Sequence, residues 1–88
     1  MVIDLGSVCN ERDLHALVKR ELGFPAFYGM NWDAFWDAIT GLIEMPDELR
    51  FAYWAELELR VPQAASALRR QFAGCHAETH GFNVVYDR

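Results

Sequence analysis

The chain has 88 residues, a formal net charge of -5, and a composition that is 52% hydrophobic and 14% aromatic. This length gives a single domain over residues 1–88, and the apolar content supplies a core, which excludes a disordered chain. The acidic balance excludes general nucleic-acid binding, which needs a basic face. The sequence has no long apolar run and no basic leader, so we expect a cytoplasmic protein without membrane contact.

The N-terminal part predicts a short buried strand followed by a helix. Residues 1–5 are rich in Val, Ile and Leu, and the Gly6-Ser7 pair ends the strand. Asn10 is a good N-cap for a helix over residues 11–22, which Gly23 terminates. Apolar residues recur inside this segment at helical spacing: Leu14, Leu17, Val18 and Leu22.

A second helix is predicted over residues 32–42, with Asn31 as its N-cap and Gly41 near its end. One stripe of this helix is apolar and is expected to be buried: Trp32, Phe35, Ile39 and Leu42. A different face carries Asp33, Trp36, Asp37 and Thr40. An aromatic residue on that second face is a feature that a plain solvated helix would not need.

The remaining chain predicts two more strands and two more helices. Residues 49–54 form the second strand, residues 55–60 a short helical turn, and Pro62 begins a further helix whose end is left open. The third strand covers residues 82–86. Strands that alternate with helices imply an α/β fold with a small parallel sheet.

The acidic residues are concentrated in the middle of the chain. Residues 31–59 contain seven acidic residues and one basic residue, whereas the rest contains six acidic and seven basic residues. Asp33 and Asp37 lie four residues apart, where like charges on one helix face repel each other. We interpret the pair as a surface built to enter a basic pocket on another molecule.

The chain resembles the barstar family, the intracellular inhibitors of a secreted bacterial ribonuclease. The resemblance covers nearly the full length and is most specific in Tyr28-Gly29-x-Asn31-x-Asp33-Ala34-x-Trp36-Asp37-x-x-Thr40-Gly41. Leu14, the segment over residues 19–22, Glu44-x-Pro46 and the final glycine-led strand support it. The resemblance implies a three-stranded parallel sheet packed with about four helices.

It also implies a function for the second helix and the loop before it, which in this family block the ribonuclease. The expected partner is a basic bacterial ribonuclease, secreted and guanyl-specific, bound in a 1:1 complex. Asp37 would take the place of an RNA phosphate, and Asp33 would meet neighbouring basic groups. By the same likeness the Met45-Pro46 bond is expected to be cis. The residues expected to face the enzyme are Phe27, Asp33, Trp36, Asp37, Thr40, Gly41 and Leu42.

The chain departs from the family pattern at three places. Phe27 replaces a tyrosine, and Leu42 replaces an aromatic residue. A glutamate that the family places on the last helix registers here with His76 or with Gly74, so we include His76 among the candidate contacts. The departures leave two alternatives open: an immunity protein of the same fold against another toxin nuclease, or an interaction module whose basic partner is not a nuclease.

The sequence indicates neither a metal site nor an enzyme. Cys75, His76 and His80 could donate to a metal, with Cys9 in addition, but they lack the two ordered ligand pairs of a structural zinc site. Neighbouring residues such as Cys75 and His76 point in different directions on a helix, which disfavours nucleophilic catalysis. Both cysteines are interpreted as free thiols, and no cofactor is expected.

Overall fold

The computed structural model describes residues 1–78 and 82–88, and for residues 75–78 it describes the backbone alone. The elements follow in the order β1 (Val2–Asp4), α1 (Glu11–Leu22), α2 (Trp32–Asp37), η1 (Ala38–Leu42), β2 (Glu48–Ala52), α3 (Trp54–Arg60), α4 (Pro62–Glu78) and β3 (Asn83–Tyr86). The strands form one parallel sheet in the order β1-β2-β3, with Ile3 beside Phe51 and Phe51 beside Tyr86. The predicted α/β fold with a three-stranded parallel sheet is therefore confirmed.

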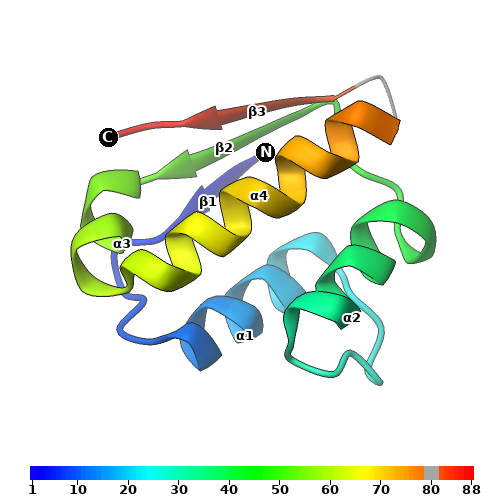
Figure 1. The fold of residues 1–88 in the computed structure, drawn as a ribbon, viewed down its shortest axis with the longest axis horizontal. Coiled ribbons are helices and arrows are strands. Elements are labelled where there is room, and N and C mark those ends of the chain that lie inside the picture. The colour runs from blue at the N-terminus through cyan, green and yellow to red at the C-terminus, as the bar shows by residue number, and fades with distance from the viewer. Residues whose placement is uncertain (79–81) are drawn as a thin grey trace.

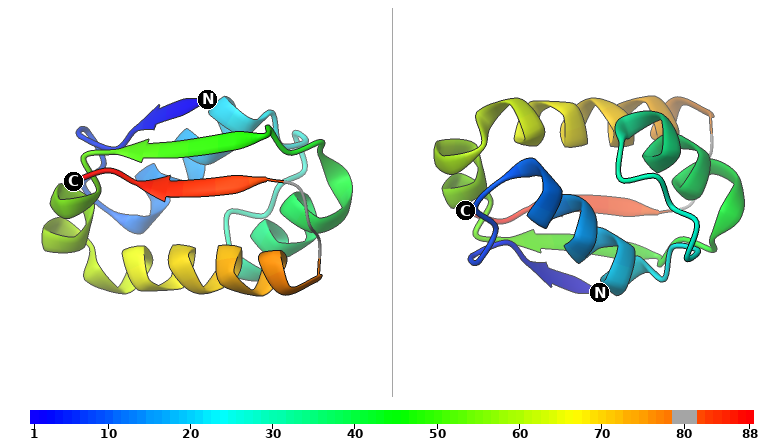
Figure 2. Two further views of the ribbon diagram at one scale, coloured as in Figure 1. Left: turned by 90° about the horizontal axis from the view of Figure 1, so that it is seen from above. Right: turned by 90° about the horizontal axis from the view of Figure 1, so that it is seen from below.

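The helices cover one face of the sheet, as Figures 1 and 2 show together. Leu49 and Phe51 of β2 are fully buried against them, and Phe35 of α2 meets Phe72 of α4 edge-on, with ring centroids 5.6 Å apart. The face of the sheet seen from above in Figure 2 carries no helix. Arg50 of β2 forms ion pairs with Glu48 and Asp87. Charged side chains of this kind are typical of a sheet face that is exposed to water.

The first helix has the predicted bounds because both of its ends carry strong signals. The Asn10 side chain accepts a hydrogen bond from the backbone N–H of Asp13, and Gly23 takes the left-handed conformation at φ 71°. A glycine adopts that conformation without the steric cost that other residues carry.

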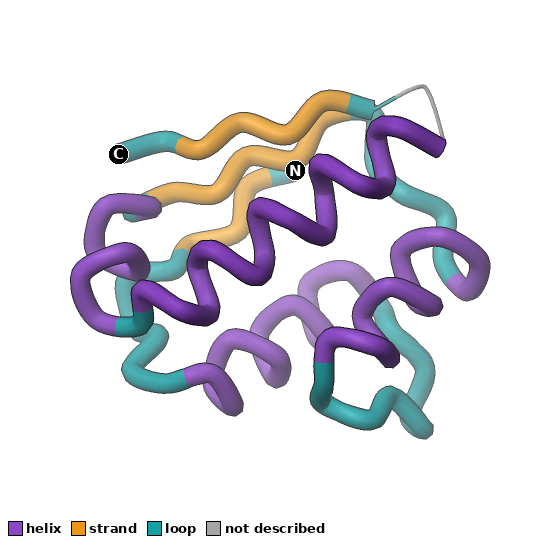
Figure 3. The backbone as a smooth tube through the Cα atoms, in the orientation of Figure 1, coloured by secondary structure: helices purple, strands orange, loops and turns teal. Residues whose placement is uncertain are grey.

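The second helix begins as predicted but changes its type before it ends. The α-helical part stops at Asp37, and Ala38–Leu42 continue as a π-helix, in which Ile43 N–H donates to the carbonyl of Ala38. Figure 3 shows the two parts as one continuous helical segment. The wider turn rotates the last residues relative to an ideal α-helix, so Leu42 is 50% exposed and does not belong to the buried stripe predicted for it.

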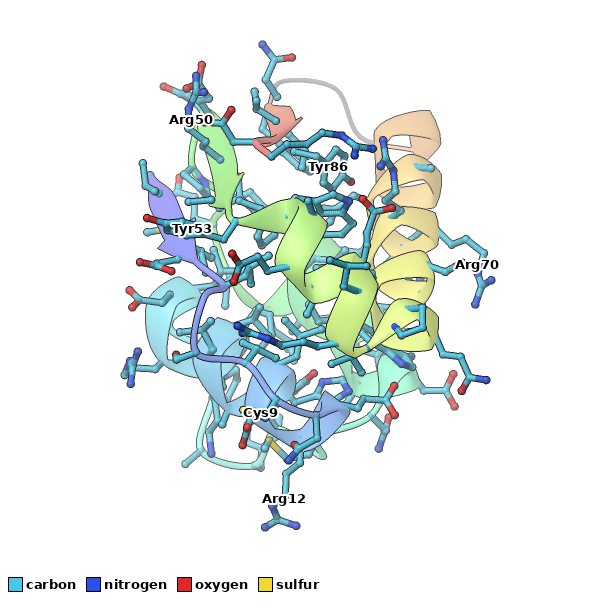
Figure 4. The ribbon with its side chains drawn as sticks, turned by 90° about the vertical axis from the view of Figure 1, so that its left-hand side faces the viewer. Cys9, Arg12, Arg50, Tyr53, Arg70 and Tyr86 are labelled. Atoms are coloured by element: carbon cyan, nitrogen blue, oxygen red, sulfur yellow. The ribbon has the colours of Figure 1, made fainter. Side chains whose placement is uncertain are left out.

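The second strand is shorter than predicted, because Trp54 begins α3 and does not extend β2. Tyr53 adopts a left-handed conformation at φ 62°, ψ 39°, and this single residue turns the chain from strand to helix. Trp54 N–H then donates to the carbonyl of Asp87, and the Trp54 ring is 1% exposed in the core. Figure 4 shows Tyr53 at this end of the sheet.

Two further expectations are settled by the backbone. The Met45–Pro46 bond is trans, so the expected cis bond is wrong. An X-Pro bond prefers trans unless a tight turn requires otherwise, and here the chain is already extended at Ile43, with φ -130° and ψ 161°. The last helix, whose end the sequence left open, continues through Gly74 to Glu78.

Candidate functional site

The acidic face consists of Asp33 and Asp37 on α2 with Trp36 between them. Both carboxylate side chains are exposed, and within the described residues neither has a hydrogen bond or an ion pair from its side chain. Asp33 lies in the first turn of α2, where the helix dipole favours a negative charge. The two charges therefore lie on one exposed surface without a side-chain partner among the described residues.

Trp36 connects this face to the core. The ring is half-buried and packs against the hydrophobic core, and it lies against Gly74 of α4. A Cβ atom placed on Gly74 would come within 3.2 Å of the indole, so a larger residue there would push the ring. The Trp36 ring is thus held against the core while part of its surface stays accessible.

An open groove runs between α2 and α4 beside the acidic face. Its lining residues come from both helices: Trp32, Asp33, Trp36, Asp37, Arg70 and Gln71. The Gln71 side-chain oxygen is buried without a hydrogen-bond partner among the described residues. Arg70 extends from α4 into solvent, as Figure 4 shows, and its guanidinium donates to the Ser66 hydroxyl at 3.3 Å. The groove therefore combines the exposed carboxylates of Asp33 and Asp37 with the guanidinium of Arg70.

Two exposed apolar side chains flank the acidic face in the sequence. Phe27, in the loop before α2, is 76% exposed, and Leu42 is 50% exposed at the end of η1. Exposed large apolar residues beside a charged centre are typical of an interface whose apolar part becomes buried on binding. Gly41 is exposed next to Leu42, and a Cβ atom placed on it would meet nothing within 4 Å.

The remaining candidates are placed differently. Thr40 is half-buried and its hydroxyl donates to the Trp36 carbonyl at 2.6 Å, so it stabilises the turn as well as lying near the face. The backbone of His76 belongs to α4, but its side chain lies outside what the structure describes, as do those of Cys75 and His80. Cys9 is an exposed free thiol.

Sequence reasoning missed the residues that hold the start of α2. His15 of α1 is 2% exposed, its Nδ1 atom lies 2.5 Å from the Tyr28 hydroxyl, and its ring lies 4.5 Å from that of Trp32. Burial lowers the pKa of His15, and the neighbouring Glu11 carboxylate partly offsets this effect. Burial also raises the pKa of Tyr28. The sequence signal that could have revealed these contacts is the position of His15 within the apolar stripe of the first helix.

Across the residues that the structure describes, no cluster of three or more His, Cys, Asp or Glu side chains could hold a metal ion. Within the same residues, no helix is both long enough and apolar enough to span a bilayer. The acidic face thus presents two carboxylates and part of an indole, and the exposed side chains of Phe27 and Leu42 flank it in the sequence.

Comparison with known proteins gives a family and, among the curated proteins that match, a relative from Bacillus subtilis. The family model described as "Barstar (barnase inhibitor)" matches residues 1–87. A protein of Bacillus subtilis (strain 168), named "Putative ribonuclease inhibitor YrdF", is 41% identical over 46 residues, which is 52% of this chain and 50% of that protein. The match therefore spans about half the length of the curated relative.

Proposed function

The chain belongs to the barstar family, and from this premise we propose that it is a cytoplasmic inhibitor that occludes the active site of a ribonuclease. The relative from Bacillus subtilis carries the name of a ribonuclease inhibitor, which agrees with this function. The protein binds its target reversibly in a 1:1 complex and carries out no chemistry of its own.

The uncompensated carboxylates of Asp33 and Asp37 are the observation that carries the proposal. A ribonuclease holds RNA phosphates with arginine, lysine and histidine side chains, and a carboxylate accepts the same paired N–H donors as a phosphate oxygen pair. Asp37 imitates the phosphate from a helix, which offers no bond for the enzyme to cleave. Asp33 contacts neighbouring basic groups of the enzyme. These cations offset the repulsion between Asp33 and Asp37 that the free protein carries.

The partner that fits best is a secreted, guanyl-specific bacterial ribonuclease with a basic active site. Phe27, Trp36 and Leu42 supply apolar contact around the acidic centre, and Thr40 and Gly41 complete the surface. His76 extends it if α4 takes part. We expect a standard interface that buries about 1,600 Å² in total.

A second candidate is an immunity protein against a different toxin nuclease. The described part of α4 brings Arg70, Gln71 and Gly74 toward α2. The glutamate of the family registers in this chain with His76 or Gly74, neither of which is acidic, and this difference supports an enzyme whose surface differs from that of the familiar target. A panel of ribonucleases and DNases distinguishes the two candidates by which enzymes are inhibited.

Replacement of Asp37 tests the proposal directly. Asp37→Ala should weaken inhibition of barnase, or of a cognate ribonuclease from the panel, by about 2 to 5 kcal/mol, a range drawn in part from the barnase–barstar complex itself. Asp47→Ala is the matched control, since it removes one exposed acidic side chain from the same acidic segment outside α2. Equal inhibition by both variants and by the wild type would exclude α2 as the inhibitory element.

A further inference from the structure

The imidazole of His15 is almost fully buried, at 2% exposure. It lies in the middle of α1, a helix whose other buried residues are Leu14, Val18 and Leu22. A buried imidazole loses its hydration and needs compensating contacts. The hydrogen bond and the ring contacts of His15 lead to Tyr28 and Trp32, in the segment that carries the acidic face.

One route from His15 leads through Tyr28 to the N-cap of α2. The Nδ1 atom and the Tyr28 hydroxyl share a hydrogen bond of 2.5 Å. The same hydroxyl lies 3.5 Å from the carbonyl oxygen of Asn31, whose side chain caps α2 by accepting from Ala34 N–H. Tyr28 also follows Phe27 directly, so this route fixes the loop and the first turn of the helix together.

The other route leads through Trp32, the first residue of α2. The rings of His15 and Trp32 are 4.5 Å apart and inclined at 52°, and Trp32 Nε1 donates to Glu11 Oε1 at 2.5 Å. Glu11 lies one turn before His15 on α1. The same helix therefore contacts the Trp32 ring through His15 and accepts its N–H through Glu11. Asp33 is the next residue along the chain.

The charges around the imidazole explain why its ionisation matters. Glu11 faces it from α1, Tyr28 from the loop and the uncharged Trp32 from α2, while Arg70 of α4 lines a groove that Glu11 and Trp32 also line. Burial disfavours the imidazolium and Glu11 only partly offsets this, so the ring is neutral at pH 7. A protonated ring regains water most readily if α1 and the start of α2 separate.

We propose that His15 is the positioning residue of the acidic face: its neutral ring fixes Tyr28 and Trp32 against α1, and its protonation releases the start of α2. Residues 27–37 then become the least stable part of the fold at mildly acidic pH, while the sheet and α4 stay folded. Because this segment carries the acidic pair, release lowers the fraction of binding-competent molecules and raises the apparent dissociation constant. That last consequence rests on the proposed inhibitory function; the local release does not.

Hydrogen exchange of the free protein tests the release without any partner. We expect the protection factors of the Ala34 and Phe35 amides, corrected for intrinsic rates, to fall between pH 7.5 and pH 5.5, because burial lowers the pKa of the imidazole in the closed state relative to the released state. Those of Ala65 and Leu68 in α4 should stay constant. Uniform loss over α2 and α4, or no loss at all, would overturn the proposal.

Three variants assign the effect to His15. His15→Gln should remove the pH dependence of α2 protection, whereas the double variant His76→Gln, His80→Gln should keep it. Tyr28→Phe removes only the hydroxyl and should lower the protection of Ala34 and Phe35 already at pH 7.5. If His15→Gln fails to fold, hydrogen exchange of the wild type and of the other two variants still tests whether the start of α2 is released on acidification. Persistence of the pH dependence in His15→Gln would contradict the proposal.

Affinity for barnase adds the functional readout. Lowering the pH from 7.5 to 5.5 should weaken wild-type binding more than it weakens binding of His15→Gln. Titration of the enzyme's own groups is common to both proteins and cancels in this ratio. If the wild type does not bind barnase, inhibition of that enzyme is refuted while the exchange experiment still decides the role of His15. Equal pH dependence of wild type and variant would refute the positioning role in binding.

Discussion

Gly41 separates the requirements of the fold from those of the proposed interface. Its backbone is helical and a Cβ atom there would meet nothing within 4 Å, so the fold does not need a glycine at this position. Gly41→Ala should raise the free energy of unfolding by about 0.5–1 kcal/mol, because alanine loses less backbone entropy on folding. Inhibition of barnase should nevertheless weaken by about 1–3 kcal/mol, since the methyl group enters a packed interface. Denaturant unfolding and inhibition assays measure the two effects.

Gly23 provides the control for this prediction. It also gives a Cβ atom open space, but its φ of 71° is strained for any other residue. Gly23→Ala should therefore cost about 1–2 kcal/mol of stability and leave inhibition unchanged. If Gly41→Ala also leaves inhibition unchanged, Gly41 lies outside the interface.

At the scale of elements, the transition from α2 to η1 depends on a side-chain bond. Thr40 donates to the carbonyl of Trp36, four residues earlier, at the point where the helix widens. Thr40→Val keeps the shape and loses this bond, so we expect a loss of about 1 kcal/mol in the free energy of unfolding. Thr40→Ser keeps the hydroxyl and should lose clearly less. Equal loss in both variants would show that the methyl group, and not the hydroxyl, stabilises the turn.

Elements were predictable from sequence where local signals decide them, and less so where distant contacts do. The first helix has the predicted bounds because Asn10 and Gly23 cap it. The second strand ends early because Trp54 is pulled into the core from α3, and Leu42 turns outward because η1 is a π-helix. No local pattern encodes these two features.

The acidic pair was equally predictable, since its exposure and lack of internal partners follow from helix spacing and charge. The contacts of His15 with Tyr28 and Trp32 were not, because they join residues 13 and 17 positions apart along the chain. The groove lined by Arg70 and Gln71 likewise depends on how α4 crosses α2. Assembly of the site required the tertiary structure.

For the whole molecule, pH sets stability through the buried rings of His15 and Tyr28 and the half-buried ring of Tyr86. The folded-state pKa of His15 is lowered, so the unfolded chain binds more protons below about pH 6.5 and the free energy of unfolding falls on acidification. Burial raises the pKa values of Tyr28 and Tyr86, so stability is full below about pH 10 and falls above it as the unfolded chain ionises. The free energy of unfolding, measured by urea titration from pH 5 to 11, should be constant between these limits. In His15→Gln it should fall less on acidification than in the wild type.

Charge distribution governs association at the same scale. Residues 31–59 carry seven acidic residues and one basic residue, and the proposed target is basic, so attraction acts before contact. Raising the salt concentration from about 20 mM to about 500 mM should lower the association rate constant by at least about tenfold, because the screening length falls well below the separation at encounter. The dissociation rate constant should change far less, since buried contacts are weakly screened. Stopped-flow mixing with barnase measures both rate constants. Asp47→Ala should reduce the salt dependence of the association rate constant without altering the dissociation rate constant. An association rate constant that does not change with salt would show that the acidic segment does not guide the encounter.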